Sequence, residues 1–206
     1  MHKSVFLHTT GRERGFTLVE LMVTVAVLVI VATVAVPNLQ EFAIRSGMNS
    51  IRDDFTIALQ RARTDAITRN TCVSICQLAT GSRDTCAPAA QRGNWQQGWV
   101  IYVNNACDGA VPAGAVPADD VVAVRQPGNQ RYQLTEDADG ALLGVATFDA
   151  RGAMVSRAAT FHLVDGQNTK SKHARDIRLS PQGRVAVVLP SNTDVEGGAV
   201  SAEAEQ

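Results

Sequence analysis

The run of residues 16–36 constrains this chain more than any other feature of its sequence. Its side chains are all apolar except those of Thr17, Glu20, Thr24 and Thr33. At about 1.5 Å per residue, a helix of this length spans roughly 30 Å, the thickness of the hydrocarbon core of a bilayer. A carboxylate in such a run costs on the order of 3 kcal/mol at mid-bilayer and less near an end, so we expect Glu20 to have a function.

Length and charge leave room for one membrane segment and one modest globular domain. The chain has 206 residues, of which 45% are hydrophobic and 19% charged, and its net charge is −1. This balance provides no overall attraction to nucleic acid or to anionic lipid. The charge is uneven, because three basic residues and one acidic residue give residues 1–15 a charge of +2, which leaves −3 for the rest.

Two common explanations of an apolar N-terminal run fit this one poorly. A cleaved secretory signal has an apolar core of about 7–15 residues that ends at a small-x-small site. This run is longer, and Ala-Thr-Val-Ala at residues 32–35 is a poor cleavage site. A plain transmembrane anchor fits the length and the basic flank. It does not explain why the run begins Gly-Phe-Thr-Leu-Val-Glu.

The junction at residues 12–21 accounts for that beginning. Its sequence, Arg-Glu-Arg-Gly-Phe-Thr-Leu-Val-Glu-Leu, resembles the leader junction of type IV prepilins and type II secretion pseudopilins. The resemblance implies that residues 1–15 are a leader, that prepilin peptidase cleaves between Gly15 and Phe16, and that Phe16 is then N-methylated. It also implies a single-pass protein of the bacterial inner membrane, with a periplasmic C-terminal domain, that enters a pilus or pseudopilus on assembly.

Glu20 and Pro37 are the candidate assembly residues of this segment. A buried carboxylate is tolerated where it meets a positive partner. In a filament of stacked helices, the free amine of a neighbouring Phe16 is one such partner, and Glu20 would then set the register between subunits. Pro37 lacks an N–H, and its ring clashes with the carbonyl four residues earlier, so we expect it to bend the helix.

An amphipathic second half of the helix is predicted over residues 37–70. Apolar residues recur there at intervals of three or four, which places them on one stripe of the helix surface. They are Ile44, Met48, Ile51, Phe55, Leu59, Ala62 and Ala66. We expect this stripe to be the face against which the globular domain packs.

Beyond Thr71 the pattern changes to short apolar or alternating runs separated by turn residues, which predicts strands. The predicted strands are residues 72–78, 98–104, 121–126, 131–134, 144–149, 160–164, 175–180 and 184–190. Residues 108–120 are predicted to form a loop, and the acidic residues 191–206 a disordered tail. The sequence therefore predicts an α+β fold, in which a long N-terminal helix packs on an antiparallel β-sheet domain of residues 71–190.

The four cysteines, Cys72, Cys76, Cys86 and Cys107, lie close together in the sequence. In an exported domain they are expected to form disulfides, for which four cysteines allow three connectivities. Pairing Cys76 with Cys86 closes a small loop and leaves Cys72 for Cys107. We favour that pairing, and the other two stay open. Zinc is the alternative, but the spacing lacks the two C-x2-C pairs typical of four-thiolate sites.

A second resemblance covers residues 59–185. It rests on the helix exit at residues 59–70 with Val73 and Cys76, on the W-x-x-G-W strand start at residues 95–102, and on the turn Ser-Pro-Gln-Gly-Arg-Val at residues 180–185. Their order and spacing resemble the GspH/FimT/FimU group of minor pilins and minor pseudopilins. The resemblance implies a structural or assembly subunit of a type IV pilus or a type II secretion pseudopilus, with other pilins and minor pilins as partners.

DNA is the alternative partner. Members that resemble FimT carry a C-terminal G-R-x-R motif, which implies DNA capture during natural transformation. Here Gly183 and Arg184 are followed by valine and alanine, so the second arginine is missing. Strand alternation predicts that Arg184 and Ala186 point outward. The predicted buried face of this strand comprises Val185, Val187 and Leu189.

A cluster of basic residues near this motif partly restores the case for DNA. Non-specific affinity for nucleic acid rests on such clusters, because each phosphate contact contributes to binding. The cluster comprises Lys170, Lys172, Arg175, Arg178 and Arg184, with Asp176 as the opposing charge. The other interpretation is that residues 170–173 belong to an exposed, solvated loop.

No pattern in the sequence indicates an enzyme. The motifs H-E-x-x-H and G-x-S-x-G and a phosphate-binding loop are all absent. Of the four histidines, His2 and His8 lie in the predicted leader, and His162 lies on a predicted strand where alternation favours a solvated face. We therefore expect no catalytic residue, no cofactor and no metal site.

Overall fold

The computed structural model describes residues 15–137, 142–168 and 171–190. The predicted leader up to residue 14, Lys170 and the predicted tail 191–206 lie outside these ranges. The chain divides into two compact units, Met1–Ala43 and Ile44–Gln206. Helix α1 (Leu18–Arg69) begins in the first unit and ends in the second.

The second unit contains residues 44–69 of α1, which carry the predicted apolar stripe. Met48, Ile51 and Phe55 are buried in the core, as are Leu59, Ala62 and Ala66 further along the helix. Ile44 packs against the edge of the same core. The stripe is thus the packing face of the domain, as the spacing predicts.

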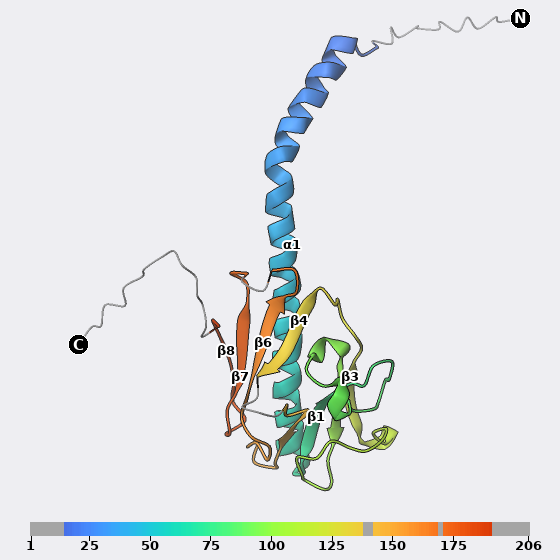
Figure 1. Cartoon of the computed structure of the whole chain (residues 1–206), viewed down its shortest axis with the longest axis vertical. Coiled ribbons are helices and arrows are strands. Elements are labelled where there is room, and N and C mark those ends of the chain that lie inside the picture. Colours follow the sequence, from blue (N-terminus) through green and yellow to red (C-terminus); the bar gives the residue numbers. More distant parts are fainter. Residues whose placement is uncertain (1–14, 138–141, 169–170, 191–206) are drawn as a thin grey trace, which may run out of the picture. The chain divides into compact units, whose positions relative to one another are not determined.

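In the described part of the chain, eight strands form two antiparallel four-stranded sheets (Figure 1). The first sheet, in the order β3-β2-β1-β5, comprises β1 (Val73–Gln77), β2 (Trp99–Val103), β3 (Val121–Arg125) and β5 (Val145–Phe148). The second, in the order β4-β6-β7-β8, comprises β4 (Tyr132–Asp137), β6 (Ala159–Asp165), β7 (Arg175–Leu179) and β8 (Val185–Val188). Short 3-10 helices lie in the loops at η1 (Ala89–Gln91), η2 (Trp95–Gln97) and η3 (Ala118–Asp120).

The sheet domain therefore consists of two sheets rather than the one that strand patterns alone suggest. Both sheets contribute to a single core around α1, with Val73 and Ile75 from the first and Phe161 and Ile177 from the second. A helix with a broad apolar stripe buries more of it between two sheets than on one. The fold is α+β, as predicted.

Four aromatic rings join the helix to both sheets at the centre of this core. Phe55 of α1 lies in edge-on contact with Trp95, Trp99 and Phe161, at centroid distances of 5.4, 5.1 and 4.8 Å. Trp95 and Trp99 are buried. Both tryptophans are thus packing residues.

The first sheet is also covered on its second face. A separate apolar cluster there contains Cys76, Leu78, Cys86, Val100, Tyr102, Val116 and Val145. Some of these residues come from the loops that follow β1 and β2. The strands β1, β2 and β5 are consequently buried along almost their whole length.

Candidate functional site

The first unit contains the predicted cleavage and assembly residues. Thr17 precedes α1 and caps it, because the Glu20 N–H donates to Thr17 Oγ1 at 3.2 Å and the Leu21 N–H donates to the Thr17 carbonyl oxygen at 3.2 Å. The side-chain oxygen satisfies an N–H that has no partner within the helix. Glu20 lies in the first turn, where a negative charge interacts favourably with the helix dipole.

Sequence reasoning missed this cap, although the sequence contains its signature. A Ser or Thr followed three residues later by Glu, at the start of an apolar run, is the pattern of a capping box. Residues 17–20, Thr-Leu-Val-Glu, match it. Thr17 and Glu20 therefore have a local role in starting the helix, whatever Glu20 contacts in an assembly.

The apolar side chains of residues 16–33 are exposed in the single chain. Phe16 is 81% exposed, and every residue from 15 to 33 is exposed. A helix that is apolar on all sides belongs in a membrane or among other subunits. Within the described residues, no single helix meets the length and composition needed to cross a membrane. The stretches Leu18–Thr33 and Asn38–Arg69, on either side of a break that contains Pro37, meet it together as a bent pair.

All four cysteines form disulfides, Cys72 with Cys107 and Cys76 with Cys86. This is the pairing favoured from the sequence, and it excludes the zinc alternative. Cys76 and Cys86 are buried in the cluster on the second face of the first sheet. Cys107, by contrast, is exposed in the loop after β2.

The Gly183–Arg184 motif lies in the tight turn between β7 and β8. Gly183 adopts a φ of +70°, and a Cβ on it would collide with the Gly152 carbonyl oxygen. That oxygen accepts a hydrogen bond from Arg63 Nε at 2.9 Å, which ties the region to α1. The Arg184 N–H donates to Ser180 Oγ at 3.2 Å across the turn. Gly183 is thus required by the backbone, while the Arg184 side chain is exposed.

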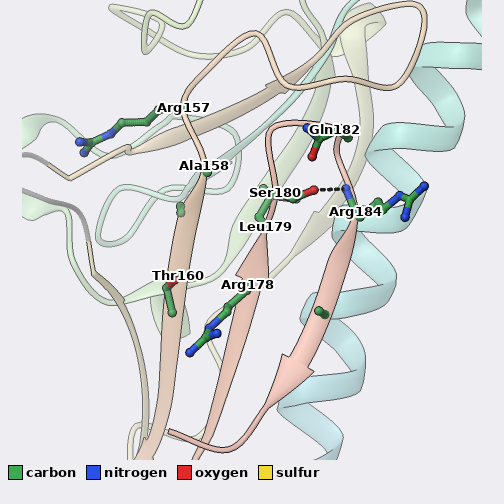
Figure 2. Close-up of a pocket in the computed structure, with 10 residues that line it drawn as sticks. Arg157, Ala158, Thr160, Arg178, Leu179, Ser180, Gln182 and Arg184 are labelled. Carbon is green, nitrogen blue, oxygen red and sulfur yellow. Dashed lines mark hydrogen bonds between the residues drawn. The ribbon is translucent and has the colours of Figure 1, made fainter. Parts of the chain in front are cut away.

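A groove of about 690 Å³ opens beside this turn, where β6 begins and β7 ends (Figure 2). Its walls hold three arginines and no carboxylate. The lining residues are Arg157, Ala158, Ala159, Thr160, Arg178, Leu179, Ser180, Gln182, Arg184 and Ala186. The groove has no aromatic side chain in its lining, so it offers cations and hydrogen-bonding groups without a surface for stacking.

The structure divides the predicted basic cluster. Arg178 and Arg184 line the groove. Arg175 lies at the other end of β7, where its Nη1 donates to the carbonyl oxygens of Lys172 and Ala174 at 3.0 and 2.6 Å. Lys170 lies outside the described residues. Arg157 joins the groove from the loop before β6, and sequence reasoning missed it because it is remote from the cluster in the chain.

Ala186, which replaces the second arginine of the motif, pairs in register with Arg178 of β7. An arginine at residue 186 would thus stand directly opposite a like charge. Arg178 supplies a cation beside the position where the motif lacks one. In Figure 2, Arg184 points to the opposite side from Arg157 and Arg178, so the three charges spread over a surface rather than converge on one point.

The prediction that Val187 and Leu189 are buried is wrong. They are 40% and 66% exposed, and only Val185 of this strand packs against the core. The reason is that β8 is the edge of its sheet, paired on one side with β7. Arg184 and Ala186 are exposed, as the alternation predicts.

Two buried acidic residues of the second sheet, Asp176 and Glu136, have partners of their own. Asp176 is buried, and its Oδ1 lies 2.7 Å from His162 Nδ1 on the adjacent strand β6. Burial raises the pKa of Glu136 above its ordinary value, and hydrogen bonds from Leu143, Gly144 and Trp95 and the charge of Arg157 oppose that rise.

In the ranges that the structure describes, no three His, Cys, Asp or Glu side chains gather as a metal site.

Together, an exposed apolar helix start and a long helix packed on antiparallel sheets define a pilin-like subunit. The chain is similar in fold to the type IV minor pilin FimU of Pseudomonas aeruginosa, with a TM-score of 0.50 and 21% identity. That alignment covers 71% of this chain and 92% of the FimU chain. At this identity the likeness concerns the fold.

Two family models match the sequence. Residues 53–183 match type II transport protein GspH, and residues 10–36 match the prokaryotic N-terminal methylation motif. The chain therefore belongs to the GspH family of type IV minor pilins and pseudopilins. Proteins of this family are structural subunits and not enzymes, which confirms that prediction through the family.

Two curated relatives are similar over part of the chain. The type IV major pilin protein PilA of Myxococcus xanthus is 34% identical over 113 residues, which are 52% of this chain and 48% of PilA. Prepilin peptidase-dependent protein D of Escherichia coli is 28% identical over 75 residues, 36% of this chain and 44% of that protein. The chain thus spans about half the length of the curated relatives it matches. The pilin-type motif and the apolar helix indicate membrane anchoring and assembly into a pilus or pseudopilus.

Proposed function

We propose that the chain is made as a prepilin, that prepilin peptidase cleaves it between Gly15 and Phe16, and that Phe16 is methylated. The subunit then stays in the inner membrane by its N-terminal helix, with the second unit in the periplasm, until it joins a filament with other pilins. The observation that carries this proposal is the exposed apolar surface of residues 16–33, which begins at a capped helix start directly after the cleavage position.

Glu20 and Pro37 act in assembly under this proposal. Glu20 lies one helical turn after Phe16. In a filament, the Glu20 carboxylate of one subunit meets the methylated amine of Phe16 of the adjacent subunit. A carboxylate and an amine that leave water together stabilise each other, whereas either alone is costly to bury. Pro37 weakens the helix hydrogen bonding at its position, which lets the apolar segment adjust its direction within a filament.

The test of processing is the mass of the mature N-terminus, measured on the protein purified from the membrane. Expected is a chain that begins at N-methylated Phe16. A chain that begins at Met1, or an unmethylated Phe16, contradicts the proposal. For assembly, Glu20→Gln is the sharp variant, with Thr24→Ser one turn later as its matched control. The Gln variant should be processed normally but should not enter filaments, while the Ser variant should do both.

Capture of DNA during uptake is the second candidate function. It is favoured by the groove beside β8, in which Arg178 and Arg184 stand without a carboxylate in the lining. Cations that are spread over a surface can contact successive phosphates of a nucleic-acid backbone. Because the lining has no aromatic side chain, the groove offers no surface on which bases stack. Binding through this groove would therefore be independent of sequence and tolerant of duplex DNA.

Gel retardation with a duplex tests this candidate. The unit Ile44–Gln206, which holds the whole core, should retard duplex DNA at low salt, and retardation should fall as salt rises. Arg184→Ala should weaken it, whereas Arg83→Ala, at an exposed position in a loop after β1, should not. Absence of retardation at low salt removes the candidate and leaves the subunit function unaffected.

A further inference from the structure

The outer edge of β8 differs from the other sheet edges of the second unit in having no cover. The edge strand β4 is met by a bridge from Asn94, and the edge strand β5 by a bridge from Met154. At the third edge, β3 shifts register against β2, and one of its carbonyl oxygens accepts a hydrogen bond from Arg61 Nη2 at 3.4 Å. Along β8, the described part of the chain forms no bridge or hydrogen bond on the side away from β7.

The pairing of β8 with β7 decides which of its backbone groups lie at this open edge. The Ser180 N–H donates to the Arg184 carbonyl oxygen at 3.0 Å, so these two residues form a hydrogen-bonded pair. Hydrogen-bonded pairs recur at every second residue of an antiparallel ladder. Residues 186 and 188 therefore direct their N–H and C=O groups to β7. The alternate residues direct these groups away from β7, and they are Val185, Val187 and Leu189.

The side chains along the open edge suit strand pairing. Val185 packs against the core, while Val187 and Leu189, which alternation places on the same face, are 40% and 66% exposed. Residues 185–189 read Val-Ala-Val-Val-Leu. Sheet edges are commonly protected by a charged residue, a proline or a bulge within the strand, and this run has no charged residue and no proline. The edge can therefore accept another strand.

Two arginines flank the open edge. Arg178 of β7 pairs in register with Ala186, whose side chain is only a methyl group. A strand added outside β8 would lie about 10 Å from β7, at two strand spacings, which an arginine and a glutamate side chain together can span. In Figure 2, the Arg184 side chain points away from Arg178, toward the side on which β8 has no partner strand. Neither arginine forms an ion pair with a described residue.

We propose that the open edge of β8 binds an extended segment of another protein, in which apolar and acidic residues alternate. The segment pairs antiparallel with residues 185–189 and exchanges backbone hydrogen bonds with the three residues whose groups point away from β7. Its apolar side chains cover Val187 and Leu189, and its carboxylate opposite Ala186 binds Arg178. A second copy of β8 fits this edge less well, because it brings no carboxylate. The contact depends on neither DNA nor filament assembly.

A synthetic probe tests this contact on the full chain in neutral detergent micelles. The probe is the end-capped, fluorescent peptide Glu-Val-Glu-Val-Glu-Val-Glu, and fluorescence polarisation measures its binding, with empty micelles as the blank. With its valines opposite residues 185, 187 and 189, its last glutamate lies opposite Arg184. The same peptide with lysine in place of every glutamate should bind at least about tenfold more weakly, because its charges repel Arg178 and Arg184.

Two N-methylated probes separate strand pairing from simple charge attraction. In the proposed register, the N–H of the central valine faces β8, whereas the N–H of the glutamate next to it faces away. Methylation of the valine nitrogen should weaken binding at least about tenfold, since it removes a hydrogen bond and adds bulk at the edge. Methylation of the glutamate nitrogen should change binding by less than about twofold, because that nitrogen donates nothing to β8. Equal binding of the two methylated probes overturns the proposal.

Val187→Pro is the matching change in the protein. It removes an N–H that faces the open edge and leaves the hydrogen bonds of β8 to β7 in place, so the probe should bind at least about tenfold more weakly. Val187→Thr keeps the N–H and should bind the probe within about threefold of the unchanged chain. Thermal unfolding shows whether each variant keeps its fold. Unchanged binding in a folded Val187→Pro chain overturns the proposal, as does self-association of the chain that Val187→Pro abolishes, since the occupant is then a second copy.

Discussion

The two sheets of the second unit use the same antiparallel pairing but differ in how they meet solvent. In the first sheet, β1, β2 and β5 are buried on both faces, because loops close over the face that α1 does not cover. In the second sheet, β6 alternates strictly between buried and half-buried residues, and β8 is an exposed edge. The first sheet is therefore an enclosed part of the core, whereas the second sheet exposes side chains to solvent on one face.

The disulfides follow the same division. Both lie in the first sheet and its loops, and neither touches β4, β6, β7 or β8. The two disulfides hold loops in place over the first sheet and so keep solvent from its second face. In the second sheet and its turn, Arg178 and Arg184 are exposed.

Phe55→Ala should have the largest effect, since it damages both sheets at once. The ring is fully buried and contacts Trp95, Trp99 and Phe161. We expect a loss of about 3–5 kcal/mol in the free energy of unfolding, measured by urea denaturation. Ile57→Ala, at a residue 60% exposed on the same helix, should cost less than about 0.5 kcal/mol. Equal losses for the two variants would contradict a core shared by both sheets.

Removing a disulfide should destabilise the domain by about 2–4 kcal/mol, through the first sheet alone. The two bonds should differ in accessibility. Under native conditions a mild thiol reductant should open Cys72–Cys107 first, because Cys107 is exposed whereas Cys76 and Cys86 are buried. Alkylation and peptide mass spectrometry measure the order. Simultaneous reduction of the two bonds would show that Cys76–Cys86 is as accessible to the reductant as Cys72–Cys107.

Gly183→Ala should cost about 1–3 kcal/mol, because the residue needs a positive φ and its Cβ would meet the Gly152 carbonyl oxygen. Gly81→Ala is the matched control. Gly81 has a φ of +78° with open space around its Cβ position, so only the backbone cost of about 1 kcal/mol applies. Thermal unfolding of both variants measures the difference, and a smaller effect at Gly183 would mean that the turn can move away from Gly152.

Asp165→Asn should lower stability by about 1 kcal/mol at neutral pH, and the difference should shrink in acid. Hydrogen bonds from Arg131 hold the pKa of Asp165 below its ordinary value. The stabilisation is therefore present above the unfolded pKa of about 3.9 and is lost as pH falls through the lower folded pKa. Unfolding at pH 7 and at decreasing pH values measures it. A difference that stays constant into acid would show that the charge of Asp165 is not responsible.

Arg184→Ala should have the smallest effect on stability, within about 0.5 kcal/mol, because its side chain is exposed and forms no ion pair with a described residue. Thermal unfolding checks this directly. The result bears on the comparison of the two sheets, because loss of an exposed side chain from the second sheet should leave the free energy of unfolding unchanged. A large loss of stability would instead show that Arg184 contributes to the fold.

Periodicity predicted the elements well because each has a clear signal. The intervals of three and four from Ile44 to Ala66 identify the helix face, and all eight predicted strands overlap observed ones. Partition into two sheets has no local signal, since it depends on how distant strands share the space around α1. For the same reason alternation failed at Val187 and Leu189, where the burial of a face depends on what lies across an edge.

The candidate site shows the same limit. Gly183, Arg184 and Arg178 were found because they lie near one motif, and Arg157 was missed because only the fold brings it there. Lys172 and Arg175 are close to the motif in sequence but lie at the other end of β7. Charge clusters along a chain therefore predict a surface charge, but strand direction decides which of the charges share a site.

The contact between Gly183 and Gly152 also bears on how such a surface can change over generations. With Arg63 fixed on the same carbonyl, the turn cannot gain or lose a residue without disturbing α1. Exchanges at the exposed positions Arg184 and Ala186 leave that backbone untouched. A single codon can therefore change the charge of this surface while the backbone of the turn stays as it is.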